Sequence, residues 1–289
     1  MSRVGNSYPA QEGNPNPGTF TKSYHLEMIS DVERVNRIVQ AVRAVGDPEK
    51  SFLEIGCGTG IFSIEAARHF GRVVAVDKDP AILEVAKRAA VRAGVAERIR
   101  FLDADVFTLS ASDLGGRFDV ALAEMMSIWT IEEPQVLAAS YARKYLLRAG
   151  AILIPDSVTN IAECGNYDFE VGDVELRTPV VEFVSRSAFR LNTTSVVAQS
   201  LDLQTVYEPK SKGVIDFRAL SNERVNCLRL SSLIHLWRDI NFYSTDTLMP
   251  TTIVPAVNDL VVKRGQVYQV AFQYNHGSPI ADAVFRLME

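Results

Sequence analysis

Residues 52–63 read FLEIGCGTGIFS, an apolar run followed by three glycines at alternate positions. The pattern predicts a buried strand, a tight turn and the start of a helix. Glycines let backbone N–H groups approach a ligand that a Cβ would block, and the N-terminus of the helix favours negative charge. A dinucleotide fingerprint needs glycine at its sixth position, but the sixth residue from Gly56 is Ile61. The stretch therefore predicts a ligand-binding loop of the form E-x-G-x-G-x-G.

Strands and helices alternate on both sides of this turn. Strands are predicted at 51–55, 72–76, 98–102, 118–123 and 151–154, with helices from the glycines to about Phe70, from Pro80 to Gly94 and from Pro134 to about Leu147. Another helix is predicted from about Leu26 to Val45, with one apolar face formed by Met28, Val32, Val35, Val39 and Val42. The alternation predicts an α/β fold with a parallel, doubly wound sheet that binds ligands at the carboxyl ends of its strands.

The sequence changes character at Pro155-Asp156, where helical periodicity gives way to short β-rich runs. These runs lie at 157–162, 180–184, 201–207, 225–230 and 267–274. We therefore expect an α/β domain at 20–154 and a smaller all-β domain, of sandwich or barrel type, at 155–289. Residues 1–19 are rich in Gly, Pro and Asn and are predicted to be flexible or to fold over a ligand as a lid.

The composition of the chain argues against several kinds of binding partner. The formal net charge of -5 argues against general nucleic-acid binding, which requires a basic surface. Cys57, Cys164 and Cys227 are widely spaced, so neither a metal site nor a disulfide framework is predicted. The sequence shows no apolar run of bilayer length and no signal peptide, so we expect no membrane partner and a cytoplasmic location.

Acidic residues follow the predicted strands. The Asp77 carboxylate could accept hydrogen bonds from both hydroxyls of a ribose, and Lys78 stands beside it. An aspartate that only forms a turn would show the same sequence pattern. Asp105 is predicted to bind an adenine amino group together with the N–H of Val106, and Asp103 competes for this role. These residues predict a nucleoside-containing ligand.

Two carboxylates flank an apolar loop after the fourth strand. Glu124 follows strand 118–123 directly, and a loop that contains Trp129 leads to Glu132-Glu133-Pro134. The same three residues also suit a plain helix start, where acidic side chains complement the helix dipole. The residues alone leave both interpretations open.

The glycine stretch resembles the first motif of the class I S-adenosylmethionine (SAM) methyltransferases. The likeness rests on the acidic residue inside the motif and on Asp77 downstream. It implies SAM as the cofactor, bound by Glu54, Gly56, Cys57, Gly58, Gly60 and the acidic residues described above.

Residues 122–136 resemble the double-glutamate loop of the protein arginine methyltransferases, in which two glutamates stand nine positions apart, as Glu124 and Glu133 do. Residues 27–34, EMISDVER, are similar to the E-M-L-x-D-x-x-R segment of that family. The resemblance implies that Met28 packs near the SAM sulfur and that Arg34 binds the SAM carboxylate, a task that suits its planar fork. It also places Glu124 among the cofactor contacts.

The β region departs from the family pattern. The family has a Thr-His-Trp loop, but here Leu236 precedes Trp237 and His235 stands one residue early. That shift turns a strand residue to the opposite face unless a bulge restores it. A restored His235 is expected to pair with Asp31 in the active site; otherwise it is an ordinary polar histidine. The region is also short for a barrel with a dimerisation arm, so a homodimer is possible but not required.

A guanidinium stays protonated and has no free lone pair. Two carboxylates can bind it, draw its charge toward the nitrogens they touch and leave the remaining nitrogen more nucleophilic. We therefore predict an enzyme, a SAM-dependent N-methyltransferase for a guanidino or amino nitrogen, on free arginine, an arginine-like small molecule or a peptide. Two alternatives stay open: a small-molecule O- or C-methyltransferase, and a SAM-binding protein without catalytic activity.

Overall fold

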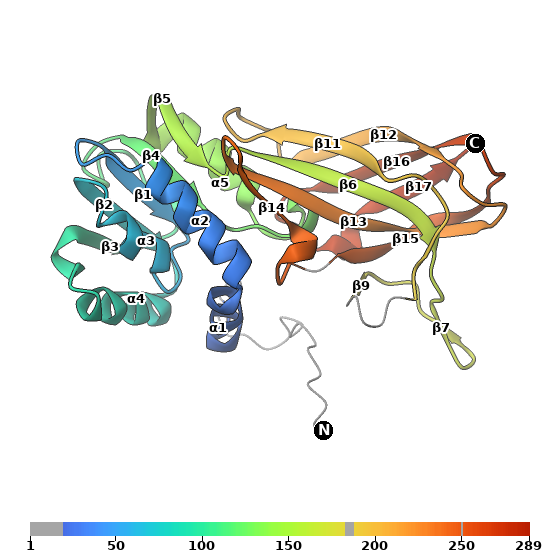
Figure 1. Cartoon of the computed structure of the whole chain (residues 1–289), viewed down its shortest axis with the longest axis horizontal. Helices are drawn as coiled ribbons and strands as arrows, with labels where there is room; N and C mark the ends of the chain where they lie inside the picture. Colours follow the sequence, from blue (N-terminus) through green and yellow to red (C-terminus); the bar gives the residue numbers. More distant parts are fainter. Residues whose placement is uncertain (1–19, 183–187, 250) are drawn as a thin grey trace.

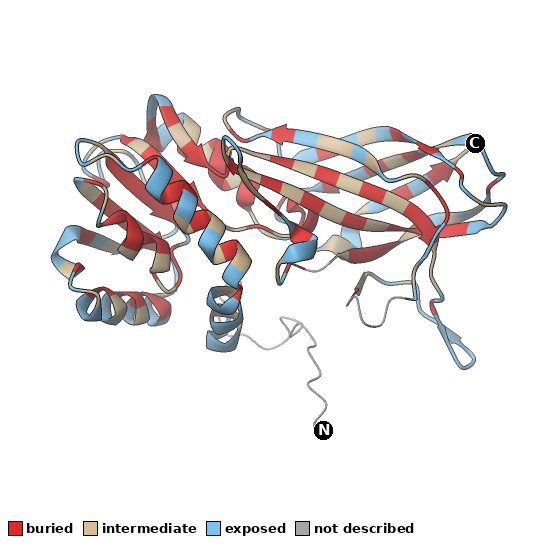
Figure 2. Ribbon diagram, viewed as in Figure 1, coloured by how far each residue is buried: buried red, intermediate tan, exposed pale blue. Residues whose placement is uncertain are grey.

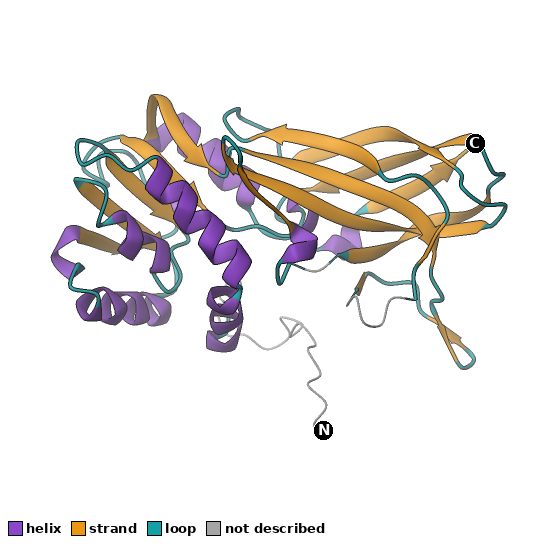
Figure 3. Cartoon of the chain, in the orientation of Figure 1, coloured by secondary structure: helices purple, strands orange, loops and turns teal. Residues whose placement is uncertain are grey.

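The computed structural model describes residues 20–182, 188–249 and 251–289. Helices gather around a parallel sheet in one half of the molecule, and long antiparallel strands make up the other half (Figure 1 and Figure 3). Residues 1–19, predicted to be a flexible segment or a lid, lie outside the described residues.

The parallel sheet has the strand order β3-β2-β1-β4-β5. Its strands are β1 (Ser51–Ile55), β2 (Arg72–Asp77), β3 (Ile99–Asp103), β4 (Phe118–Ala123) and β5 (Leu147–Ile154). The order reverses between β1 and β4, and in such sheets a ligand crevice opens beyond the carboxyl ends of the strands at this reversal. The prediction of a doubly wound α/β fold is confirmed.

The helices that accompany this sheet are α1 (Lys22–Ser30), α2 (Val32–Ala44), α3 (Ile61–Ala66), α4 (Pro80–Arg92), α5 (Gln135–Tyr141) and the short turns η1 (Ala96–Arg98), η2 (Val106–Thr108) and η3 (Ile128–Thr130). The start of α4 follows the prediction, because the Asp79 side chain accepts a hydrogen bond from the Ala81 N–H at 2.9 Å. No helix within the described residues is both long and apolar enough to cross a membrane.

The single helix predicted from Leu26 to Val45 is wrong, because Asp31 divides it into α1 and α2. The Asp31 carboxylate caps α2 by accepting a hydrogen bond from the Arg34 N–H at 3.3 Å. Its other oxygen accepts from the Leu248 N–H at 2.7 Å, a contact with a distant part of the chain. Val32, predicted on the apolar face, is the first residue of α2 and is 68% exposed.

The helix predicted from Pro134 to Leu147 is also shorter than expected. After α5 the chain forms a π-helical turn, η4 (Ala142–Leu146), and β5 begins at once. Gly150, predicted to end the helix, lies inside β5 at φ 73°, and the pairing of β4 with β5 shifts register here. A left-handed glycine suits such a strand irregularity as well as it suits a helix end.

The antiparallel half is built on β6 (Ser157–Asn166) and β13 (Arg224–Trp237), which pair along most of their length. The strands and turns around them are β9 (Val180–Val181), β10 (Arg190–Leu191), β11 (Val196–Asp202), β14 (Ile240–Tyr243), η6 (Ser244–Asp246) and β15 (Thr252–Val261). A second sheet contains β12 (Lys210–Arg218), β16 (Val267–Asn275) and β17 (Val284–Met288), with η7 (Ile280–Asp282) before the last strand. Contacts of β15 with β17 and of β11 with β12 curl the sheets around one interior, so the predicted all-β region is confirmed.

Some of these strands differ from the runs predicted from the sequence or were not predicted. The run at 201–207 is mostly a turn, since β11 ends at Asp202, and the run at 180–184 forms only the two-residue β9 before residues that the structure does not describe. β12, β15 and β17 were not predicted. A short hairpin of β7 (Glu170–Val171) and β8 (Val174–Glu175) projects from this half (Figure 1).

One hydrophobic core runs through both halves, and buried positions continue from the parallel sheet into the antiparallel strands (Figure 2). Phe52 of β1, Leu230 of β13 and Phe272 of β16 belong to this core. Trp129, in the loop after β4, is fully buried against the antiparallel half, and its ring centroid lies 5.5 Å from that of Phe272. The loop after β4 is therefore part of the joint between the two halves.

Candidate active site

The glycine loop forms a cradle beyond β1. Gly56, Gly58 and Gly60 have φ values of 70°, 51° and 74°, which favour glycine over residues with a side chain. A Cβ at Gly60 would stand 2.9 Å from the Cβ of Ala86, so this position has no room for one. The N–H groups of Gly56 and Cys57 both donate to the carbonyl of Val76 in β2, which anchors the loop to the sheet.

Asp77 faces this loop from the end of β2. One carboxylate oxygen accepts from the Gly58 N–H at 2.8 Å, and the other accepts from the Asp79 N–H at 3.0 Å. Glu54 lies below the loop, fully buried, and is hydrogen-bonded to the Ser63 hydroxyl. Burial raises the pKa of Glu54 to about 8, so its carboxyl group is mostly protonated at neutral pH.

The other residues predicted to contact the cofactor differ in their exposure to solvent. Lys78 is exposed, and Asp105 is exposed and caps η2 by accepting from the Phe107 N–H at 3.0 Å. Val106, the first residue of this turn, is buried. Cys57 is buried, and burial raises the pKa of its thiol well above the usual value, so it remains a thiol.

Arg34 and Glu124 form a buried ion pair at the carboxyl end of β4. Arg34 also contacts Met28, with its Nη1 at 2.7 Å from the sulfur. Within the described residues, Arg34 Nε and Glu124 Oε1 have no hydrogen-bond partner although both are buried. Each residue therefore keeps a polar atom available for a ligand.

Glu133, at the other end of the loop, accepts a hydrogen bond from the Tyr24 hydroxyl at 3.1 Å. The Ser127 Oγ accepts from the N–H groups of Glu132 and Glu133 at 2.9 and 3.1 Å, which holds the backbone there. Burial, followed by the charge of Glu124, raises the pKa of Glu133 to about 7. The charge of one glutamate therefore acts on the other, and the site has excess negative charge when both are ionised.

The chain is similar to known methyltransferases in sequence and in fold. Residues 52–150 match a methyltransferase domain family. An arginine N(omega)-methyltransferase of Streptomyces achromogenes subsp. streptozoticus is 28% identical over 136 residues, which cover 46% of this chain and 38% of that protein. Protein arginine N-methyltransferase 1 of Saccharomyces cerevisiae is 28% identical over 244 residues, which cover 75% of this chain and 66% of the yeast protein. The chain thus spans less than two thirds of the length of each relative.

A solved structure shares the fold. It is the Trypanosoma brucei PRMT1 enzyme-prozyme heterotetrameric complex with AdoHcy, with a TM-score of 0.75, 16% identity, and coverage of 93% of this chain and 99% of that one. Residues 52–150 are a class I methyltransferase domain. The fold of the chain is that of the protein arginine methyltransferases, as the sequence predicted.

The residues of this methyltransferase fit its cofactor. Because the three glycines with left-handed backbone have no side chains, a ligand can approach their backbone atoms directly. Asp77 lies beside them, since its carboxylate accepts from the Gly58 N–H. The unpaired Nε of Arg34 is a spare donor for a carboxylate. When bound, SAM supplies an electrophilic methyl group on a sulfonium.

The predicted pairing of His235 with Asp31 is wrong. Both carboxylate oxygens of Asp31 accept backbone hydrogen bonds, as described above for the break between α1 and α2. His235 Nε2 lies 3.3 Å from the Thr159 hydroxyl, on the face of β13 opposite the buried Ile234 and Leu236. The register of β13 with β14 does shift after His235, but the shift leaves the side chain on this outer face.

Two residues near the site escaped the sequence analysis. The ring of His25 in α1 lies over the glycine loop, with Nδ1 only 3.2 Å from where a Cβ on Gly58 would stand. Burial lowers the pKa of His25. Gln135, fully buried, accepts from the Met125 N–H at 2.8 Å and so fixes the backbone next to Glu124. The position of His25 just before the EMISDVER segment could have indicated its place near the site. No feature of the sequence indicated the role of Gln135.

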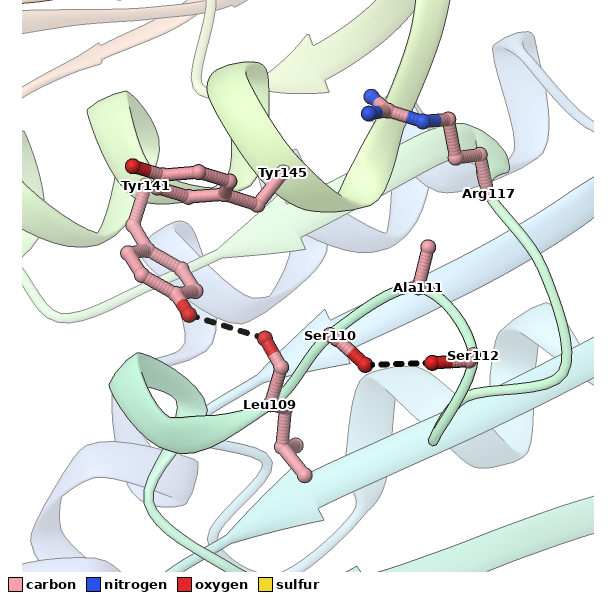
Figure 4. A pocket seen from close by; sticks show the side chains of 7 residues that line it. All are labelled: Leu109, Ser110, Ala111, Ser112, Arg117, Tyr141 and Tyr145. Carbon is pink, nitrogen blue, oxygen red and sulfur yellow. Dashed lines mark hydrogen bonds between the residues drawn. The ribbon is translucent and has the colours of Figure 1, made fainter.

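A separate cavity of about 320 Å³ lies beside α5 (Figure 4). The residues that line it are Leu109, Ser110, Ala111, Ser112, Arg117, Tyr141 and Tyr145. The Tyr141 hydroxyl donates to the Leu109 carbonyl at 2.9 Å (Figure 4). None of the predicted cofactor or catalytic residues lines this cavity, so it is not part of the candidate active site.

Proposed function

We propose that this methyltransferase transfers a methyl group to a guanidino or amino nitrogen, with Glu124 and Glu133 as the residues that bind it. One observation carries the proposal: the guanidinium of Arg34 already lies on Glu124, so this carboxylate accommodates a guanidinium in a buried setting. Within the described part of the chain, Glu124 keeps a second oxygen without a partner, and its charge acts on Glu133. Free arginine, an arginine-like small molecule or arginine in a peptide would satisfy this pair.

The two carboxylates would act by binding and alignment. Charge-assisted hydrogen bonds from a guanidinium to Glu124 and Glu133 fix its plane and draw its positive charge toward the bound nitrogens. The third nitrogen then keeps more electron density for attack on the methyl group. Because the glutamates are held on opposite ends of one anchored loop, their placement costs little reorganisation during the reaction.

The cofactor contacts are part of the same proposal. The backbone at Gly56, Gly58 and Gly60 would contact SAM. Asp77 would bind its ribose, and Arg34 would bind its carboxylate. The remaining proposed contacts are Met28, Glu54, Cys57, Lys78, Asp105, Val106 and Glu124. We place the boundary between the cofactor domain and the substrate domain at residues 154 and 155, between β5 and β6.

The experiment is methyl transfer from labelled SAM to free arginine, an arginine-rich peptide and a pool of cell metabolites in parallel. We expect label on a guanidino nitrogen of arginine or of the peptide, located by mass fragmentation of the product. Label only on a metabolite without a guanidine or amine would contradict the proposed substrate class. Bound SAM with no transfer to any acceptor would favour a non-catalytic role.

A second candidate is an O- or C-methyltransferase for a small molecule. The observation that favours it is the pKa of Glu133, which at about 7 suits a general base for a hydroxyl or an acidic carbon. In that case the label would reside on oxygen or carbon in the same product analysis.

We also propose that the chain associates with a second copy of itself. The β7–β8 hairpin projects with Val171 and Val174 exposed, followed by the exposed Leu176. The Trypanosoma brucei neighbour is a heterotetramer, which supports assembly in this fold. Sedimentation of the full chain tests this; a monomer at all concentrations would contradict it.

A further inference from the structure

The loop between the two glutamates has a backbone that side chains rarely permit. Trp129 and Thr130 have φ values of 57° and 55°, in the left-handed region, and neither is glycine. Consecutive residues of this kind persist only where their surroundings hold them. The groups that hold this turn therefore fix the path of the chain from Glu124 to Glu133.

Three polar side chains inside the antiparallel half bond to the backbone of Trp129, and one of them is the Tyr274 hydroxyl, which donates to the Trp129 carbonyl at 3.3 Å. The other two are linked to each other. The Trp129 N–H donates to the Ser232 Oγ at 3.1 Å, and its carbonyl accepts from the Asn160 Nδ2 at 3.3 Å. The Ser232 hydroxyl donates in turn to the Asn160 Oδ1 at 3.0 Å, across the β6–β13 pair where these residues lie opposite each other. Both side chains are fully buried, so they are costly unless they are paired, and the turn supplies their partners.

The segment after β16 holds the next two residues. The His276 Nδ1 lies 2.8 Å from the Thr130 carbonyl oxygen, so this nitrogen carries a proton and donates it. The N–H groups of Gly277 and Ser278 donate to the Ile131 carbonyl at 2.6 and 3.2 Å. Three successive carbonyls, at 129, 130 and 131, thus accept hydrogen bonds from the antiparallel half.

We propose that Asn160, Ser232 and His276 are positioning residues, through which the antiparallel half sets the placement of Glu133 relative to Glu124. None of the three is among the residues that would touch substrate. The inference rests on the proposed function, since it gives the glutamate pair its alignment. A displacement of about 1 Å in such an arrangement can lower turnover by about a hundredfold.

The test compares Asn160→Ala with Asn226→Ala. Asn226 is a matched control, because it is a buried asparagine of the same half that also bonds to backbone, with its Oδ1 and Nδ2 on the N–H and carbonyl of Tyr167 at 3.0 and 2.8 Å. We measure kcat, the substrate KM, the SAM dissociation constant by equilibrium dialysis, and Tm. We expect Asn160→Ala to lower kcat by about ten- to a hundredfold, with SAM affinity within about twofold, and Asn226→Ala to lower Tm alone.

A kcat of Asn160→Ala within about twofold of wild type, or equal losses of kcat in both variants, would overturn the inference. Glu133→Gln, assayed in parallel, separates it from the proposed function. Full turnover by Glu133→Gln would refute the role of the glutamate pair itself. A large loss in Glu133→Gln together with an active Asn160→Ala would refute only the positioning role.

His276 supplies a second test that does not depend on the folding of the Asn160 variant. His276→Gln retains a side-chain N–H that can reach a carbonyl, whereas His276→Leu has none. We expect His276→Leu to lower kcat without a matching change in SAM affinity, and His276→Gln to restore a large part of it. Equal kcat values in the two variants would contradict the proposal.

Discussion

Glu133 is subject to opposing influences on its ionisation. Burial and the charge of Glu124 raise its pKa to about 7, whereas the hydrogen bond from Tyr24 lowers it. A protonated Glu133 cannot neutralise a guanidinium, so substrate binding requires the ionised form. A bound cation would in turn favour that form.

We therefore predict that kcat/KM rises with pH through about 7 and then levels off, since kcat/KM reports the free enzyme. Tyr24→Phe removes the hydrogen bond that lowers the pKa, so its profile should shift to higher pH. Initial rates across the range from about pH 5.5 to 9 measure both. A profile that falls through pH 7, or one that Tyr24→Phe leaves in place, would contradict this assignment.

At the scale of elements, the turn from β1 into α3 depends on glycine for two reasons that can be separated. Gly60 and Gly94 have similar φ values, 74° and 70°, so alanine costs about 1–2 kcal/mol of backbone strain at either position. A Cβ at Gly60 would also meet Ala86 at 2.9 Å, whereas a Cβ at Gly94 would meet nothing within 4 Å.

We predict that Gly60→Ala weakens SAM binding by about tenfold or more, because the loop must move to relieve the contact. Gly94→Ala, at the far end of α4, should lose only the stability that the backbone strain costs and keep its SAM affinity. Equilibrium dialysis and thermal unfolding of both variants measure the two effects. Equal SAM affinities in the two variants would show that the loop does not bind the cofactor.

Local signals in the sequence were sufficient for the parallel sheet. Asp79-Pro80 marks the start of α4 through a cap that needs only neighbouring residues, and the glycine stretch marks the turn after β1. The acidic residues at strand ends could be placed together because the carboxyl ends of parallel strands share one edge.

Structural features that depend on contacts with distant residues could not be predicted from the sequence. The break at Asp31 relies on the Leu248 N–H, more than two hundred positions away. β12 reads KSKGVIDFR, whose polar residues and glycine hide the strand pattern until pairing with β16 is known. His235 was matched to a family position one residue away, and only the observed face of β13 shows that it bonds to Thr159.

At the scale of the whole molecule, the candidate site lies where the two halves share their core. Glu124 belongs to the end of the parallel sheet, while the loop beyond it carries Trp129 into the antiparallel half. α1 adds Tyr24 from the other side. The substrate groups thus depend on contacts from both halves, and an isolated cofactor domain would lack part of them.

The most direct measurement is turnover of Glu133→Gln against Glu132→Gln, with SAM affinity measured on the same samples. Glu132 is the adjacent, exposed glutamate of the same loop and serves as the matched control. We predict that Glu133→Gln lowers kcat by about a hundredfold or more at unchanged SAM affinity, because a neutral amide cannot draw charge from a guanidinium. Glu132→Gln should remain active, and equal activity of the two variants would contradict the role of the glutamate pair.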